Sequence, residues 1–146
     1  MGARTEPALH STADTVCKTD ANSALEFTGE RFTPECVREI WYEHFHRYAF
    51  ALSLVGGKTV LDAACGEGYG SSLLATAAGS VLGLDISAQA VTHAINRYAG
   101  QRANLAFQQA DVAALDAMPS GSFDVICSFE TLEHLHAQES MLAGFR

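Results

Sequence analysis

Hydrophobic periodicity divides the chain into a leader, one long helix and a repeating unit of strands and helices. Residues 1–24 are rich in Ala, Thr, Ser and Asp and show no periodicity, which predicts a flexible leader. Thr33-Pro34-Glu35 is typical of a helix start, and Gly56-Gly57 is typical of a helix end. Between them, apolar residues recur at helical spacing, namely Val37, Ile40, Trp41, Phe45, Tyr48, Leu52 and Val55. We therefore expect residues 25–57 to form an N-terminal helical cap.

Beyond residue 58 the pattern changes to short apolar runs that alternate with amphipathic stretches. We predict strands that end at or near acidic residues, over 59–62, 81–85, 105–111 and 123–130. We predict helices over 69–78, 88–99 with Ser87 as N-cap, and from Leu132 to Arg146, with a short connection over 112–122. Strands that alternate with helices predict a doubly wound parallel α/β sheet with right-handed crossovers over residues 58–146.

An acidic residue stands at the end of each predicted strand: Asp62, Asp85, Asp111 and Glu130. Ligands of doubly wound sheets bind outside the carboxyl ends of the strands, so these acids are expected to line one crevice. The alternative is that each acid only stabilises a helix N-terminus. That alternative explains Asp62 least well, because Asp62 precedes the turn and does not cap the helix.

The turn after the first strand, Asp62 to Gly70, contains glycines at positions 66, 68 and 70. A dinucleotide fingerprint would need a third glycine at position 71 or 73, where the chain has Ser71 and Leu73. A P-loop would need a lysine, and Glu67 would repel a pyrophosphate. The turn therefore favours a nucleoside ligand that lacks phosphates and carries positive charge.

The run from Val60 to Gly70 resembles motif I of the class I S-adenosylmethionine-dependent methyltransferases, which have a Rossmann-like fold. Asp85 and Asp111 match the acids that end the second and third strands of that family, and residues 123–126 resemble its fourth-strand motif. The family usually has glycine where this chain has Ala64. The segments 27–34 and 43–48 resemble a leader of bacterial members associated with glycan and polysaccharide pathways, in which the leader packs over the cofactor cleft.

The resemblance implies S-adenosylmethionine as the cofactor and assigns it a set of contacts. Asp62 and the backbone of Gly66–Gly70 would hold the methionine end, Asp85 would accept both ribose hydroxyls, and Asp111 with the Val112 amide would bind adenine. The implied cofactor site comprises Asp62, Ala64, Cys65, Gly66, Gly68, Asp85, Ile86, Asp111, Val112 and Phe129.

On the acceptor side, Glu130, Glu133 and His134 have the spacing of one helical face. Similar clusters in some O-methyltransferases of the family help to bind a divalent metal or to orient an acceptor hydroxyl. We assign catalysis to these three residues, with His134 as base, and predict no metal site, although the resemblance leaves a divalent metal at this cluster open. The alternative is that both acids stabilise the helix start and His134 is solvated, as we expect for His44 and His46. The Asn/Asp-Pro-Pro-Tyr/Phe motif of base and glutamine methylation is absent. The expected reaction is O-methylation of a small molecule or sugar.

Composition restricts the partners and the compartment. The 146 residues include 17 acidic and 9 basic side chains, a net charge of −8, which argues against nucleic acid and anionic membrane surfaces as partners. The four cysteines form no metal or disulfide pattern, and we see neither a signal peptide nor a membrane span, so we expect a cytoplasmic protein.

The family sheet has seven strands, and this sequence supplies four. We therefore expect a domain that is incomplete at its C-terminus, with the fourth strand as an exposed edge that favours a homodimer. The alternative functions are a truncated, non-catalytic module that binds a nucleoside or a partner and, less favoured, an NAD(P)-dependent reductase.

Overall fold

The structure is a computed structural model that describes residues 39–115 and 118–146, with the backbone alone for residues 39–43. The predicted leader, the helix start at Thr33-Pro34-Glu35 and the segment 27–34 lie outside the described residues. No described helix is long and apolar enough to cross a bilayer.

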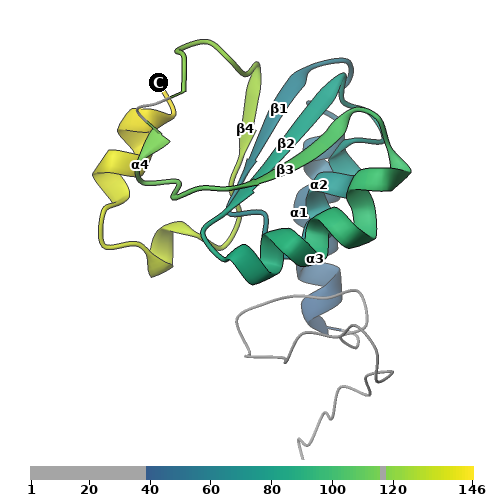
Figure 1. The fold of residues 1–146 in the computed structure, drawn as a ribbon, viewed down its shortest axis with the longest axis horizontal. Helices are drawn as coiled ribbons and strands as arrows, with labels where there is room; N and C mark the ends of the chain where they lie inside the picture. The colour runs from purple at the N-terminus through teal and green to yellow at the C-terminus, as the bar shows by residue number, and fades with distance from the viewer. Residues whose placement is uncertain (1–38, 116–117) are drawn as a thin grey trace, which may run out of the picture.

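Four parallel strands form the sheet: β1 (Thr59–Ala63), β2 (Ser80–Asp85), β3 (Leu105–Gln109) and β4 (Val125–Cys127). Their order across the sheet is β3-β2-β1-β4 (Figure 1), which confirms the predicted parallel α/β fold. Successive strands run outward from β1 on one side, and β4 then returns to its other side. The order in which strands are added therefore reverses beside β1, and ligands of such folds bind at this kind of switch point.

The helices on one face of the sheet are α1 (Glu39–Leu52), α2 (Tyr69–Leu74) and α3 (Ala88–Tyr98), followed by the 3₁₀ turn η1 (Ala99–Gln101). Ser87 caps α3 as predicted, because its side chain accepts a hydrogen bond from the Ala90 N–H at 3.3 Å. The second helix is shorter than predicted. Its last turn tightens into i→i+3 bonds, with the Thr76 and Ala77 N–H groups donating to Leu73 and Leu74.

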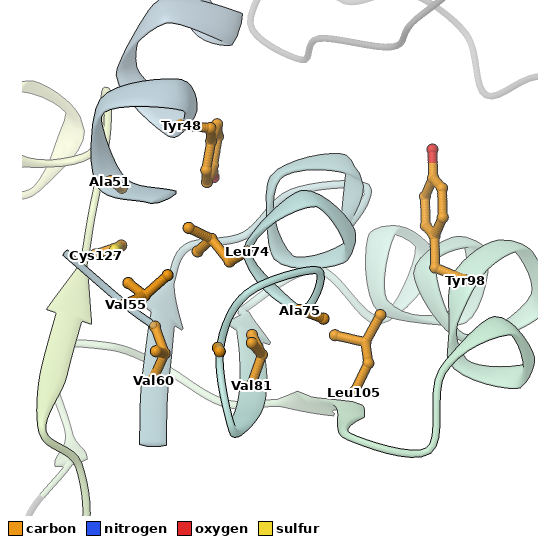
Figure 2. Close-up of a cluster of buried hydrophobic side chains, with 11 residues drawn as sticks. Tyr48, Ala51, Val55, Val60, Leu74, Ala75, Val81, Tyr98, Leu105 and Cys127 are labelled. Carbon is orange, nitrogen blue, oxygen red and sulfur yellow. The ribbon is translucent and has the colours of Figure 1, made fainter. Parts of the chain in front are cut away.

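Alternate residues of each strand face two separate hydrophobic layers. Figure 2 shows the layer beneath α1 and α2, where Tyr48 and Ala51 of α1 lie above Leu74, and Val60 and Val81 project from the sheet. The opposite layer contains Leu61, Ala63 and Leu84 of the sheet with Met141 of α4 (Gln138–Gly144). Because Asp62 follows Val60 by two positions, it faces the α1 and α2 side of the sheet.

The segment after β4 departs from the prediction of one helix from Leu132 to Arg146. A single 3₁₀ turn, η3 (Leu132–His134), is followed by extended chain and then by α4. Glu130 has a left-handed backbone with φ 53°, and the Gln138 side chain donates to the Leu132 carbonyl at 2.7 Å. Because Glu130 is not helical and η3 ends at His134, the expected common helical face of Glu130, Glu133 and His134 is wrong.

Within the described part of the chain, β4 pairs only with β1 and forms one edge of the sheet, as expected. It is also shorter than predicted, since only Val125–Cys127 joins the ladder. The homodimer expected through this edge stays a prediction.

Candidate functional site

A cavity of about 460 Å³ opens at the carboxyl ends of β1, β2 and β4. This volume lies within the range of about 300–1,000 Å³ that is typical of small-molecule sites. Its walls come from α1, the β1–α2 turn, the chain after β2 and β3, and the chain after β4. The lining residues are His44, Tyr48, Ala64, Cys65, Gly66, Glu67, Tyr69, Gly70, Asp85, Ile86, Asp111, Val112, Phe129, Glu130, Thr131, His134 and Leu135.

The β1–α2 turn is fastened to the neighbouring strand, because the Cys65 N–H donates to the Leu84 carbonyl at 2.8 Å. Gly66 has φ 55°, and a Cβ at this position would meet no protein atom within 4 Å. By contrast, a Cβ at Gly68 would lie 2.6 Å from the Ala94 Cβ, and one at Gly70 would overlap the ring of Tyr48. Gly66 is therefore the glycine that leaves room for a ligand, whereas Gly68 and Gly70 allow other parts of the protein to pack closely.

Asp85 is held in place by two backbone donors. Its Oδ2 accepts from the Gly66 N–H at 2.8 Å, and its Oδ1 accepts from the Ser87 N–H at 2.8 Å. Among the described residues, each carboxylate oxygen accepts one hydrogen bond, which leaves it a second lone pair, and the side chain lines the cavity. The arrangement presents two adjacent acceptors of fixed orientation, which suits a pair of neighbouring hydroxyl groups.

Asp111 and Val112 form the wall that follows β3. Asp111 Oδ1 accepts from the Ala113 N–H at 2.8 Å, which fixes the carboxylate at the cavity edge. Among the described residues, no group accepts from the Val112 N–H. The wall therefore offers an acceptor and a donor side by side, the complement of an adenine edge.

Asp62 lies beneath the cavity and is not part of its lining. Its carboxylate is fully buried and accepts from Ser71 Oγ at 2.6 Å and from the Tyr48 hydroxyl at 3.2 Å. Burial raises the pKa of Asp62 from 3.8 to about 6, even though both hydrogen bonds favour the charged form. The sequence placed Asp62 in contact with the cofactor, whereas in the structure its described polar contacts are with protein side chains.

Two residues other than glycine have positive φ in the described chain: Ala64 at 63° and Glu130 at 53°. Both line the cavity, at the carboxyl ends of the neighbouring strands β1 and β4. Glu130 Oε1 lies 2.6 Å from a guanidinium nitrogen of Arg47, so an ion pair joins α1 to the chain after β4. Strained backbone on both sides of one cavity is typical of a functional site.

The two described cysteines are unsuited to nucleophilic chemistry. Burial raises the pKa of Cys127 to about 12 and raises that of Cys65 well above its ordinary value, with the Asp62 charge adding to both effects. Both thiols therefore stay protonated at neutral pH. Cys65 lines the cavity as a small apolar residue.

The structure brings together most of the residues that the sequence singled out. Those that line the cavity are Ala64, Cys65, Gly66, Asp85, Ile86, Asp111, Val112, Phe129, Glu130 and His134. Asp62, Gly68 and Glu133 do not line it. No group of three His, Cys, Asp or Glu side chains among the described residues is arranged to hold a metal ion.

The sequence interpretation missed several lining residues, above all His44, which was expected on a solvated helix face. His44 lies one helical turn before Tyr48, and that spacing was the signal for a shared wall. Thr131 and Leu135 also line the cavity without having been assigned a role in binding. Glu67 and Tyr69 line it as well, within the turn whose backbone the resemblance had assigned to the cofactor.

Comparisons with known proteins agree with this geometry. A family model described as a methyltransferase domain matches residues 60–146. A probable S-adenosylmethionine-dependent methyltransferase of Mycolicibacterium smegmatis is 35% identical over 123 residues, which cover 83% of this chain and 46% of that protein. A ubiquinone biosynthesis O-methyltransferase of Albidiferax ferrireducens is 38% identical over 82 residues, covering 56% of this chain and 32% of the relative.

Two solved structures share the fold. The YcgJ protein of Bacillus subtilis has a TM-score of 0.64 at 21% identity, covering 69% of this chain and 44% of the other. The magnesium protoporphyrin IX methyltransferase of Synechocystis, solved with S-adenosylmethionine bound, has a TM-score of 0.60 at 26% identity. The match covers 73% of this chain and 54% of the Synechocystis chain.

This chain spans less than half the length of the M. smegmatis relative. The family match covers more than half of the chain, and the cavity lies at the switch point of the sheet. This chain belongs to the class I S-adenosylmethionine-dependent methyltransferases.

Proposed function

We propose that this chain binds S-adenosylmethionine in the cavity and supports transfer of its methyl group to an oxygen of a small-molecule or sugar acceptor. The observation that carries the proposal is the Asp85 carboxylate, which is held by the Gly66 and Ser87 amides and turned toward the cavity. In this role, Asp85 accepts from both ribose hydroxyls. The cofactor, when bound, supplies an activated methyl group on a positively charged sulfonium.

The described walls fit the remaining parts of that cofactor. Asp111 accepts from the adenine amino group while the Val112 N–H donates to a ring nitrogen. The open side of Gly66 leaves room for the methionine portion, and Ala64, Cys65, Ile86 and Phe129 supply apolar contacts. The acidic lining residues Glu67, Asp85, Asp111 and Glu130 suit a positively charged ligand.

The acceptor is proposed to bind at the end of the cavity formed by the chain after β4. His134 lines this end and takes the proton from the acceptor hydroxyl, while Glu130, held by Arg47, orients that hydroxyl. Glu133 is exposed and lies off the cavity lining, so we assign it no contact with the acceptor. The name of the Albidiferax ferrireducens relative supports oxygen as the methylated atom.

Calorimetric titrations with S-adenosylhomocysteine and with NAD, performed separately, test the cofactor. We expect the first nucleoside to bind and NAD to show no binding. Binding of NAD without S-adenosylhomocysteine would support the reductase and overturn the proposal.

Substitution of His134 tests the acceptor step, with His136 as a matched control, since it is exposed and lies off the cavity lining. Assayed with a panel of hydroxylated acceptors, His134→Ala should lower kcat by about 100-fold or more, and His136→Ala should leave it near the parent value. Cofactor binding without transfer to any acceptor would favour the non-catalytic module.

A further inference from the structure

Three polar side chains, Tyr48, Asp62 and Ser71, form a buried cluster beneath the cavity wall. They come from α1, β1 and α2, and both hydroxyl groups donate to the carboxylate of Asp62. Asp62 and Ser71 are fully buried, whereas Tyr48 also lines the cavity. The cluster thus connects α1 to the strand from which the glycine turn begins.

Tyr48 reaches this carboxylate because its ring fits against two other parts of the wall. A Cβ at Gly70 would overlap the ring, so the glycine at that position makes room for it. On another side, the ring meets Phe129 edge to face, with ring centroids 5.0 Å apart. The adjacent Arg47 pairs with Glu130, so α1 contacts the wall on both sides of the cavity.

Asp62 has an unusual charge environment for a carboxylate. Burial and the nearby Asp85 raise its pKa to about 6, and the bonds from Ser71 and Tyr48 hold the pKa below what burial alone would produce. Burial also raises the pKa of the Tyr48 phenol, so this hydroxyl remains a donor. The titratable groups around Asp62 are Tyr48 on α1, Cys65 in the glycine turn, Asp85 at the end of β2 and Cys127 on β4.

We propose that Tyr48 is a positioning residue of the cofactor site: its hydroxyl supports the buried Asp62 carboxylate, whose negative charge selects a positively charged nucleoside over a neutral one. The inference rests on the proposed function, because S-adenosylmethionine carries a sulfonium charge that S-adenosylhomocysteine lacks. A carboxylate in a low-dielectric layer beneath the wall acts on such a charge without touching it. Selection by charge therefore depends on a hydroxyl group supplied by α1.

The parent protein provides the first test, by calorimetric titration with both nucleosides at pH 7.5 and pH 5.5. Both ligands carry an ammonium, a carboxylate and an adenine and differ in the sulfonium charge, so the ratio of their affinities reports mainly on that charge. Because Asp62 takes up a proton near pH 6, the preference for S-adenosylmethionine should fall by about threefold between these pH values. A preference that does not change with pH overturns the inference.

Tyr48→Phe then removes the hydroxyl but keeps the ring against Gly70 and Phe129. Loss of this donor raises the pKa of Asp62 further, so the fall in preference between the two pH values should become larger than in the parent protein and begin closer to neutral pH. Ser71→Ala removes the other donor and should act in the same direction. Tyr69→Phe is the matched control, because Tyr69 lines the same cavity and is not among the donors to Asp62.

The results separate this inference from the proposed function. If neither nucleoside binds the parent protein, both proposals fall. If both bind and Tyr48→Phe weakens them equally at each pH, the tyrosine has only a structural role and the inference falls alone. If Tyr48→Phe does not fold, Ser71→Ala and the pH dependence of the parent protein decide the outcome.

Discussion

The ring of Tyr48 occupies the space that any side chain at position 70 would need. The third glycine of the turn is therefore required by a helix that precedes the sheet in the chain. Two of the turn's glycines therefore have different functions. Gly66 leaves open space at the cavity, whereas Gly70, which also lines it, makes room for Tyr48 of α1.

Alanine at positions 66 and 70 should consequently have different effects. Gly70→Ala displaces Tyr48, so we expect the free energy of unfolding to fall by about 2 kcal/mol. In Gly66→Ala the new methyl group meets no protein atom, so the free energy of unfolding should fall by only about 1 kcal/mol, because of the positive φ. The methyl group enters the space left for the ligand, however, so the free energy of S-adenosylhomocysteine binding should be reduced by more than about 1 kcal/mol. Urea denaturation and calorimetry measure the two effects, and a Gly70→Ala protein of parental stability would contradict this assignment.

Asp85→Ala should weaken the binding of S-adenosylhomocysteine by at least about 100-fold, because the two hydrogen bonds from the ribose hydroxyls to a charged group are lost. Asp124→Ala is a matched control. Asp124 accepts from the Thr59 N–H at 2.8 Å at the amino ends of β1 and β4, away from the cavity. Its loss should therefore lower the free energy of unfolding by about 1 kcal/mol and leave the affinity for S-adenosylhomocysteine unchanged. Calorimetry compares the variants, and unchanged affinity in Asp85→Ala would show that the ribose assignment is wrong.

Ala64→Gly should raise the free energy of unfolding by about 1 kcal/mol, because glycine adopts a φ of 63° without strain. Ala63→Gly provides the comparison one residue earlier, within β1 and fully buried, where we expect a loss of about 1 kcal/mol. Urea denaturation distinguishes these opposite signs. A less stable Ala64→Gly protein would mean that contacts of the Ala64 methyl group outweigh the strain.

Asp62 should make the stability of the unliganded protein depend on pH. Its pKa is raised from 3.8 to about 6, so the folded state holds this proton more tightly than the unfolded chain. The resulting stabilisation is complete below pH 3.8 and is lost as pH rises through 6, a change of about 3 kcal/mol. Asp62→Asn lacks this change, so it should gain stability relative to the parent protein between pH 4 and 7. Parallel denaturation curves for the two proteins across this range would refute the prediction.

Local pattern was sufficient to predict the parallel sheet and the acidic residues at the carboxyl ends of its strands, whereas most other lining residues were implied by the family resemblance. Short apolar runs mark buried strands, and parallel strands necessarily bring their carboxyl ends to one edge. Asp85, the last residue of β2, and Asp111, two residues after the end of β3, therefore line the same cavity. Asp62 differs because it lies inside β1, where the strand alternation turns it toward α1 and α2 and buries it.

The conformation after β4 could not be predicted from helical spacing. Glu130 adopts a left-handed backbone, and its partner Arg47 comes from a helix far earlier in the chain. Beyond the end of η3, the Gln138 side chain donates to the Leu132 carbonyl. Hydrophobic periodicity contains no information about side-chain contacts of either kind, so it could not predict the interruption of the helix.

The sequence by itself determined the strands, the glycine turn and the acidic residues that follow the strands, because these depend on neighbouring residues and on the geometry of a parallel sheet. Only the tertiary structure decided which glycine leaves open space at the cavity, that Asp62 is buried beneath it, and that His44 of α1 lines its wall. These outcomes arise from packing between α1, the sheet and the chain after β4, where side chains far apart in sequence compete for the same space.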